Sequence, residues 1–256
     1  MRRQEALGFL FCEGGRGFER RSAAARVGVE EIFSRKLSVT ESSHHSPHYL
    51  VILLFTYYYS QMQKRVFIIH GWDATPDYGW FPWLKKELEN RGFAVTIPQL
   101  PNTEEPRINN WVPTVASVVG EPDEQTYFIG HSMGCQTIAR YLETLPVGIK
   151  IGGVVFVAGF FKRLSGLEDD EIVRDVAKEW LETPLNLNIV AGHIKGSVAI
   201  FSDDDPYVPM DNQEEYRDIL KSEIIIEHGK GHFSASAGTV ELPVALDSLL
   251  RVSETK

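Results

Sequence analysis

The fold is decided by residues Thr126–Gly134, TYFIGHSMG, in which an apolar run ends in a turn that opens a helical pattern. Residues 126–130 predict a buried strand, and residues 133–144 predict a helix. Between them lies G-x-S-x-G, where a serine sits in a sharp strand-to-helix turn and the flanking glycines prevent clashes between Cβ atoms. This turn exposes the Ser132 hydroxyl near the positive end of the following helix. We therefore expect Ser132 to be a nucleophile.

The same alternation of apolar runs and amphipathic segments extends on both sides of this turn. Continuous Val, Ile and Phe runs predict strands at 65–71, 93–97, 126–130, 151–158, 197–202 and 223–227. Helices are predicted at 81–90, 108–119, 133–144, 169–181, 213–221 and 240–252. Such runs are typical of parallel strands that are buried on both faces. The pattern predicts an α/β fold with a mostly parallel sheet of about six strands and helices on both faces. Ligands bind such sheets beyond the carboxyl ends of the strands.

A serine needs a base to become nucleophilic at neutral pH. His232 follows the last predicted strand in the loop GKGHF (229–233), and its glycine neighbours suggest a loop that presents the imidazole. We predict that His232 is this base. His228 is the nearest competitor, but its place at the end of a strand favours a sheet-edge or core position.

A carboxylate should orient the base and stabilise its charged form. The stretch SDDDPYVP (202–209) follows the fifth predicted strand and offers three adjacent carboxylates. Ser, then Asp, then His is the chain order of the triad in α/β-hydrolases. We predict that Asp205 is the carboxylate that orients the base, with Asp204 as the second candidate.

Acyl transfer also requires two donors for the oxyanion of the tetrahedral intermediate. One is predicted to be the backbone N–H of Met133, next to the nucleophile. The other should come from the loop HGWD (70–73), where the backbone N–H of Trp72 is our candidate. His70 is expected to be a structural hydrogen-bonding residue, and Asp73 a loop or cap residue.

Composition excludes several classes of protein. The chain of 256 residues is 43% apolar and 24% charged, which is ordinary for a globular protein. A net charge of −9 argues against a nucleic-acid partner. Two cysteines cannot form a disulfide framework and fit a reducing, cytoplasmic compartment. No apolar run reaches the roughly 18 residues of a membrane-spanning helix, so a membrane partner is not expected.

Residues 1–61 differ from the rest of the chain. They contain 8 Lys and Arg, 6 Glu and no Asp, whereas residues 62–256 contain 18 basic and 29 acidic residues. The apolar run at 49–60 lies too far from the start for an ordinary signal peptide, although it is compatible with a membrane-associating segment. We favour a native start at Met62. This predicts a hydrolase domain over 62–256 and a weakly structured or spurious extension over 1–61.

These motifs together resemble the small serine hydrolases related to retinoblastoma-binding protein 9, a compact branch of the α/β-hydrolase superfamily. The resemblance covers residues 62–256 and rests on five stretches: VFIIHGWDATP (66–76), WFPWLKKELENRGF (80–93), FIGHSMG (128–134), SDDDPYVP (202–209) and KGHF (230–233). It implies a minimal α/β-hydrolase without a large lid and a triad of Ser132, Asp205 and His232. The implied substrates are small esters or amides, and no metal or organic cofactor is expected.

The namesake of that family is associated with an L-x-C-x-E peptide that binds a pocket protein. This chain lacks the peptide, because Cys12 in LFCEG (10–14) has the wrong spacing. A pocket-protein partner is therefore not predicted. Two other functions use the same fold: a catalytically idle module that binds partners, and an acyltransferase or thioesterase with the same triad.

Overall fold

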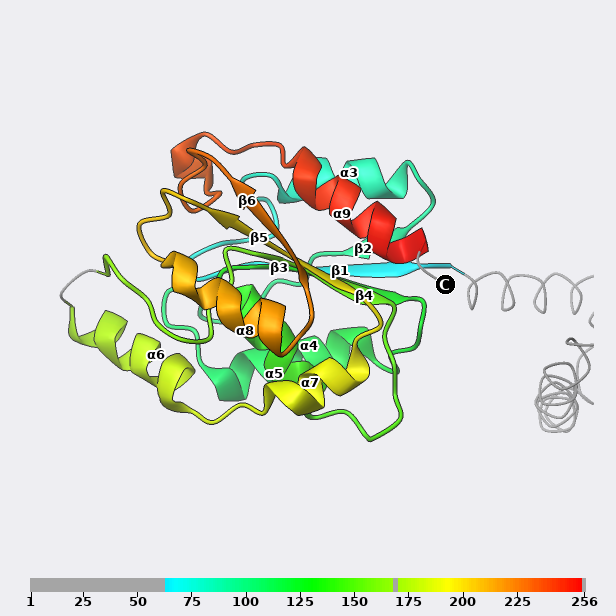
Figure 1. The fold of residues 1–256 in the computed structure, drawn as a ribbon, viewed down its shortest axis with the longest axis horizontal. Coiled ribbons are helices and arrows are strands. Elements are labelled where there is room, and N and C mark those ends of the chain that lie inside the picture. The colour runs from blue at the N-terminus through cyan, green and yellow to red at the C-terminus, as the bar shows by residue number, and fades with distance from the viewer. Residues whose placement is uncertain (1–62, 168–169, 255–256) are drawn as a thin grey trace, which may run out of the picture. The chain divides into compact units, whose positions relative to one another are not determined.

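The computed structural model describes residues 63–167 and 170–254, and Figure 1 shows their arrangement. Their strands form one sheet, all of it parallel, in the order β2-β1-β3-β4-β5-β6. The strands are β1 (Arg65–Ile69), β2 (Ala94–Thr96), β3 (Thr126–His131), β4 (Gly153–Val157), β5 (Ser197–Ser202) and β6 (Glu223–Glu227). The predicted parallel sheet of about six strands is confirmed.

The chain reverses its direction of travel across the sheet next to β1. From β1 it crosses to β2 at one edge, then returns to β3 on the other side of β1 and continues outward to β6. Ile69, the last residue of β1, is in register with Gly130 on β3. The carboxyl ends of β1 and β3 therefore meet at the point where open α/β sheets bind their ligands.

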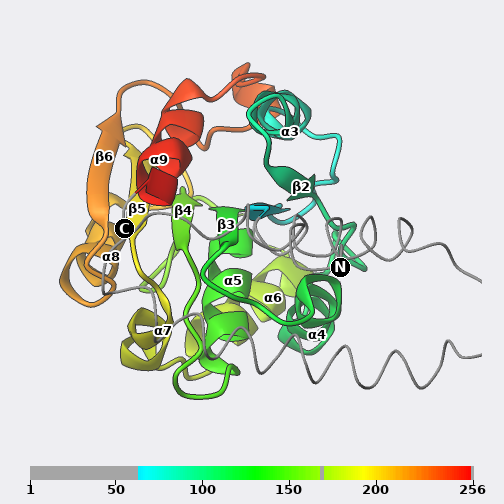
Figure 2. The ribbon, with the colours of Figure 1, turned by 90° about the vertical axis from the view of Figure 1, so that its right-hand side faces the viewer.

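Helices cover both faces of the sheet, as Figure 2 shows. Helices α3 and α9 lie over one face, and α4, α5, α6, α7 and α8 lie on the other. Their bounds are α3 (Phe81–Glu89), α4 (Ile108–Val119), α5 (Met133–Glu143), α6 (Glu171–Glu182), α7 (Leu187–His193), α8 (Gln213–Asp218) and α9 (Pro243–Glu254). Three 3₁₀ residues, Met210–Asn212 (η2), precede α8, and Ala235–Ala237 (η3) precede α9.

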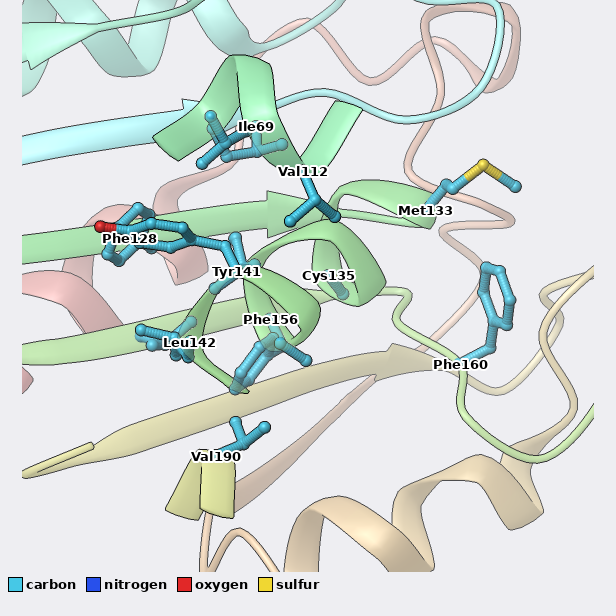
Figure 3. Close-up of a cluster of buried hydrophobic side chains, with 14 of the residues drawn as sticks. Ile69, Val112, Phe128, Met133, Cys135, Tyr141, Leu142, Phe156, Phe160 and Val190 are labelled. Carbon is cyan, nitrogen blue, oxygen red and sulfur yellow. The ribbon is translucent and has the colours of Figure 1, made fainter. Parts of the chain in front are cut away.

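Two hydrophobic clusters explain the continuous apolar runs in the strands. On β3, Phe128 belongs to the cluster under α4 and α5, whereas Ile129 belongs to the cluster under α3 and α9. The same alternation holds on β4 for Phe156 and Val157. Because these central strands are buried on both faces, apolar residues follow one another in them without alternation. Figure 3 shows the first cluster, with Met133 at the end that faces the carboxyl edge of the sheet.

Several predicted boundaries differ from those in the structure. The helix predicted from residue 169 begins at Glu171, because the Asp170 side chain accepts hydrogen bonds from two backbone N–H groups and caps it. The closing helix begins at Pro243 rather than at 240. Ile151 forms only an isolated bridge to Ile194, so β4 is shorter than predicted. Helix α7 was not predicted at all.

In the described part of the chain, no helix is both long and apolar enough to cross a membrane. The predictions for residues 1–61, including the apolar run at 49–60 and the domain boundary at Met62, lie outside the described residues.

Candidate active site

Ser132 occupies the turn between β3 and α5 in a conformation that few L-residues adopt. Its φ is 53° and its ψ is −120°, and its backbone N–H donates to the Val157 carbonyl at 2.8 Å. Such a backbone conformation costs of order 1–3 kcal/mol and is held only where the surrounding structure imposes it. The predicted strand-to-helix turn is present.

The two glycines of G-x-S-x-G are required by close backbone contacts. A Cβ atom on Gly134 would lie 2.1 Å from the Ile69 carbonyl oxygen, and one on Gly130 would lie 2.9 Å from the backbone nitrogen of Cys135. The first contact means that α5 starts against the end of β1. Both glycines therefore act by letting the turn pack closely.

His232 and Asp205 are brought together across two loops. The Nδ1 of His232 lies 2.8 Å from Oδ2 of Asp205, and their side chains are 13% and 2% exposed. The other carboxylate oxygen, Oδ1, accepts hydrogen bonds from the backbone N–H groups of Tyr207 and Val208. These contacts fix the carboxylate, so Nδ1–H of His232 is the donor to Asp205 and Nε2 is the ring nitrogen left for another partner.

The neighbouring carboxylates have separate partners. Asp203 lies 2.6 Å from Nδ1 of His228, whose side chain is 83% exposed, and this contact raises the pKa of His228. Oδ1 of Asp204 accepts from the Ser202 hydroxyl at 2.7 Å and from the Gly231 N–H at 2.8 Å, which lowers the pKa of Asp204. Asp205 alone of the three bonds to His232. His228 lies at the sheet edge, as expected.

His131 is a residue of this site for which the sequence analysis predicted no role. Its Nε2–H donates to the backbone carbonyl of His232 at 2.8 Å, and the two rings lie 5.0 Å apart. Burial is the main reason that the pKa of His131 falls to about 3, with the nearby His232 adding to it. His131 is therefore neutral and holds the backbone of His232. Its place beside Ser132 in the motif was the only available signal.

His70 has the structural role that was predicted for it. Its Nδ1–H donates to the Gly71 carbonyl at 3.0 Å, and its Nε2 accepts from the Leu100 N–H at 3.3 Å. Burial lowers its pKa. Both ring nitrogens are thus used to fix the loop that follows β1.

A cavity of about 320 Å³ lies beyond the carboxyl ends of the strands, and both Ser132 and His232 line it. Its apolar wall consists of side chains that follow β1, β3, β4 and β5: Trp72, Met133, Phe160, Leu164, Leu167 and Tyr207. Met133 and Phe160 also belong to the hydrophobic cluster of Figure 3, so the wall continues the core. The arrangement can hold a small, partly apolar molecule next to a serine and a histidine.

The two predicted oxyanion donors border the same cavity. Met133 is the first residue of α5, and the first N–H groups of a helix have no acceptor within it. Trp72 lines the cavity, while its indole N–H donates to the Glu104 carbonyl at 3.0 Å. Gly71 passes close to the nucleophile, since a Cβ there would lie 3.0 Å from Cβ of Ser132. The loop that contains Trp72 thus passes beside Ser132.

Residues 63–167 and 170–254 contain no group of three or more His, Cys, Asp or Glu side chains placed to hold a metal ion. Cys135 is a buried, free thiol whose Sγ lies 3.5 Å from the Val157 carbonyl oxygen. Burial raises its pKa. Cys135 is therefore a core residue.

Comparison with known proteins identifies the family. The family model described as serine hydrolase matches residues 66–251. A Bacillus subtilis (strain 168) protein named as the hydrolase YdeN is 33% identical over 189 residues, which are 73% of this chain and 95% of that protein. The serine hydrolase RBBP9 of Rattus norvegicus is 28% identical over 165 residues, covering 64% of this chain and 83% of its own.

Solved structures agree with this assignment. The crystal structure of the ydeN gene product from B. subtilis has a TM-score of 0.69 and 30% identity, and the match covers 75% of this chain and 100% of that one. Est1E from Butyrivibrio proteoclasticus, with a TM-score of 0.58, 13% identity and coverage of 75% and 89%, shows the shared fold alone. The chain belongs to the serine hydrolase family and has a compact α/β-hydrolase fold that is similar to the structure of the ydeN gene product.

Proposed function

We propose that this protein hydrolyses small carboxylic esters or amides through an acyl-enzyme intermediate, with Ser132 as nucleophile, His232 as base and Asp205 as the orienting carboxylate. One observation carries the proposal. The buried hydrogen bond between Asp205 and His232 lies at the edge of the cavity that Ser132 lines.

The hydrogen bond selects the tautomer that catalysis needs. With Nδ1–H of His232 donating to Asp205, Nε2 is the ring nitrogen whose lone pair can take a proton from Ser132. Tyr207 packs edge-on against the imidazole, with the ring centres 5.2 Å apart, and His131 holds the backbone of the same residue. The imidazole is therefore held in place before substrate binds, so that it does not have to reorient before it takes the proton.

In the acylation step, the Ser132 oxygen attacks the carbonyl carbon while Nε2 of His232 takes the hydroxyl proton. The oxyanion accepts hydrogen bonds from the backbone N–H groups of Trp72 and Met133. The imidazolium, stabilised by Asp205, then protonates the departing alcohol or amine. Water attacks the acyl-enzyme by the same route, with His232 again as the base, and the carboxylic acid leaves.

Labelling with a fluorophosphonate probe tests the proposal. An activated serine displaces the fluoride and becomes covalently phosphonylated, so we expect labelling of the purified protein at Ser132, located by mass spectrometry. Ser132→Ala should abolish labelling, and His232→Ala should reduce it on the order of 10³-fold or more. A folded protein that is not labelled would contradict the proposal and favour a catalytically idle binding module.

We also propose that the partner is a small ester or amide molecule and that the protein acts in the cytoplasm, since its few cysteines suit a reducing compartment. Transfer of the acyl group to an alcohol or thiol instead of water would use the same residues. Product analysis in the presence of a competing alcohol separates hydrolysis from transfer.

A further inference from the structure

The described lining of the cavity at Ser132 includes an acidic side chain but no Lys or Arg, and acyl transfer itself does not require this difference. Among the described residues that line it, Asp73 is the one carboxylate, and neither Lys nor Arg is present. The other side chains with polar groups in the lining belong to serines, tyrosines, Trp72 and two histidines. Of these histidines, His131 is neutral and His232 is hydrogen-bonded to Asp205.

Asp73 has a fixed backbone and an exposed carboxylate. Its N–H donates to the Thr103 carbonyl at 2.8 Å, and its φ is 53°. Within the described part of the chain, its carboxylate has no hydrogen-bond or ion-pair partner. The residue is exposed and lies in the lining of the cavity.

The backbone does not account for a charge at this position. Asp, Asn and Gly all adopt positive φ more easily than other residues, so Asn would satisfy the same turn. Oxyanion stabilisation is not served by a carboxylate in the loop that follows the Trp72 N–H, because negative charge opposes the developing oxyanion. Neither the backbone conformation nor the acyl transfer explains a carboxylate at position 73, whereas an interaction with the substrate does.

We infer that Asp73 makes this site selective for esters or amides that carry a positive charge, and that it disfavours anionic substrates. The inference rests on the proposed function of Ser132 and His232 and adds the charge class of the substrate. Opposite charges about 4 Å apart that stay exposed to water attract enough to change kcat/KM by about fivefold to tenfold. The small cavity and its apolar wall limit the rest of the substrate to a short aliphatic or aromatic group.

Matched pairs of esters test the inference on the full chain. Butyrylcholine is compared with 3,3-dimethylbutyl butyrate, in which carbon replaces the quaternary nitrogen, and 3-sulfopropyl butyrate is the anionic member. Ethyl 4-(trimethylammonio)butanoate and ethyl 5,5-dimethylhexanoate place the charge on the acyl side instead. Hydrolysis is followed by pH-stat, and the readout is the ratio of kcat/KM for the cationic and neutral members of a pair.

We expect a cationic preference of about fivefold to tenfold at low salt in at least one pair, and the slowest turnover for the sulfonate. Asp73→Asn should bring that ratio to about one, and 0.5 M salt should weaken it in the unmodified protein, since salt screens exposed charges. Asp77→Asn is the matched control, because Asp77 is an exposed carboxylate outside the set that lines this cavity.

The outcomes separate this inference from the function on which it rests. Turnover with ratios near one, or ratios that Asp73→Asn leaves unchanged, would overturn the charge selectivity while leaving the hydrolase intact. Failure to turn over any ester, together with no fluorophosphonate labelling, would overturn both. Equal effects of Asp73→Asn and Asp77→Asn would show that overall charge is responsible, and would also overturn the role of Asp73.

Discussion

At the scale of single residues, His131 connects folding stability to pH. The imidazole is buried, its Nε2–H is donated to the His232 carbonyl, and its pKa is lowered to about 3. In the unfolded chain the pKa of a histidine is about 6.5. Between these two values the unfolded state binds a proton that the folded state does not. The free energy of unfolding therefore falls as the pH falls below about 6.5.

We predict that His131→Gln reduces the loss of stability on acidification. Integration of the proton-binding difference gives a loss of about 1.4 kcal/mol between pH 7.5 and 5.5 for one such histidine. Between these two pH values, the free energy of unfolding of the variant should fall by about this amount less than that of the unmodified protein. This holds even though the variant is less stable at pH 7.5. Urea unfolding at both pH values measures the difference.

His228 supplies the opposite control. Its contact with Asp203 raises its pKa, so its contribution to stability is present below about pH 6.5 and is lost as pH rises through the folded-state pKa. His228→Gln should not lessen the loss on acidification. If His131→Gln and His228→Gln behave alike, the linkage assigned to His131 is wrong.

The three adjacent carboxylates have different hydrogen-bond partners, so substitutions of them should affect labelling of Ser132 differently. Asp205→Asn should slow labelling of Ser132 by about 10³- to 10⁴-fold, because an amide favours the wrong tautomer of His232. Asp204→Asn keeps an oxygen that can accept from Ser202 and Gly231. It should slow labelling by no more than about tenfold, the cost of one weakened hydrogen bond. A larger loss in Asp204→Asn would reverse the assignment.

At the scale of elements, the turn between β3 and α5 depends on close packing against β1. We predict that Gly134→Ala destabilises the protein by more than about 3 kcal/mol, because its Cβ would meet the Ile69 carbonyl oxygen at 2.1 Å and backbone cannot move aside cheaply. Thermal unfolding measures the change.

Gly192→Ala is the matched control on a helix. Gly192 lies in α7, is exposed, and has no atom within 4 Å of an added Cβ. Alanine there should stabilise the protein by about 0.5–1 kcal/mol through helix propensity. Equal effects of the two substitutions would show that the turn does not require glycine at 134.

The long apolar runs and the motif predicted most elements, because burial on both faces leaves a strong signal in the sequence. The signal for helix α7 in the sequence is weak, because its seven residues make only two helical turns. Its cap residue, Asn186, is also common in turns. Ser132 and His232 were predicted as site residues because each follows a predicted strand. The contact of His131 with the His232 carbonyl joins residues 101 positions apart, which no local pattern reports.

At the scale of the whole molecule, the two hydrophobic clusters and the sheet are built from one continuous part of the chain. Among the described residues, the members of both clusters run from Val66 to Val252. The sheet order places β1 next to β3 inside the sheet, so that the loops after both strands reach Ser132. Closing the cavity requires the loops after β4, β5 and β6 as well, and all three belong to the same part of the chain.

We therefore predict that a chain beginning at Met62 folds and is labelled as the full chain is. Since the described members of both clusters lie within residues 66–252, removal of residues 1–61 should change the free energy of unfolding by less than about 1 kcal/mol, a shift of no more than about 2–4 °C in the unfolding temperature for a domain of this size. The rate of fluorophosphonate labelling should also be unchanged. Scanning calorimetry and labelling of both chains make the comparison. A shorter chain that aggregates or is not labelled would mean that residues 1–61 contribute to the hydrolase domain, and the domain boundary predicted at Met62 would then be wrong.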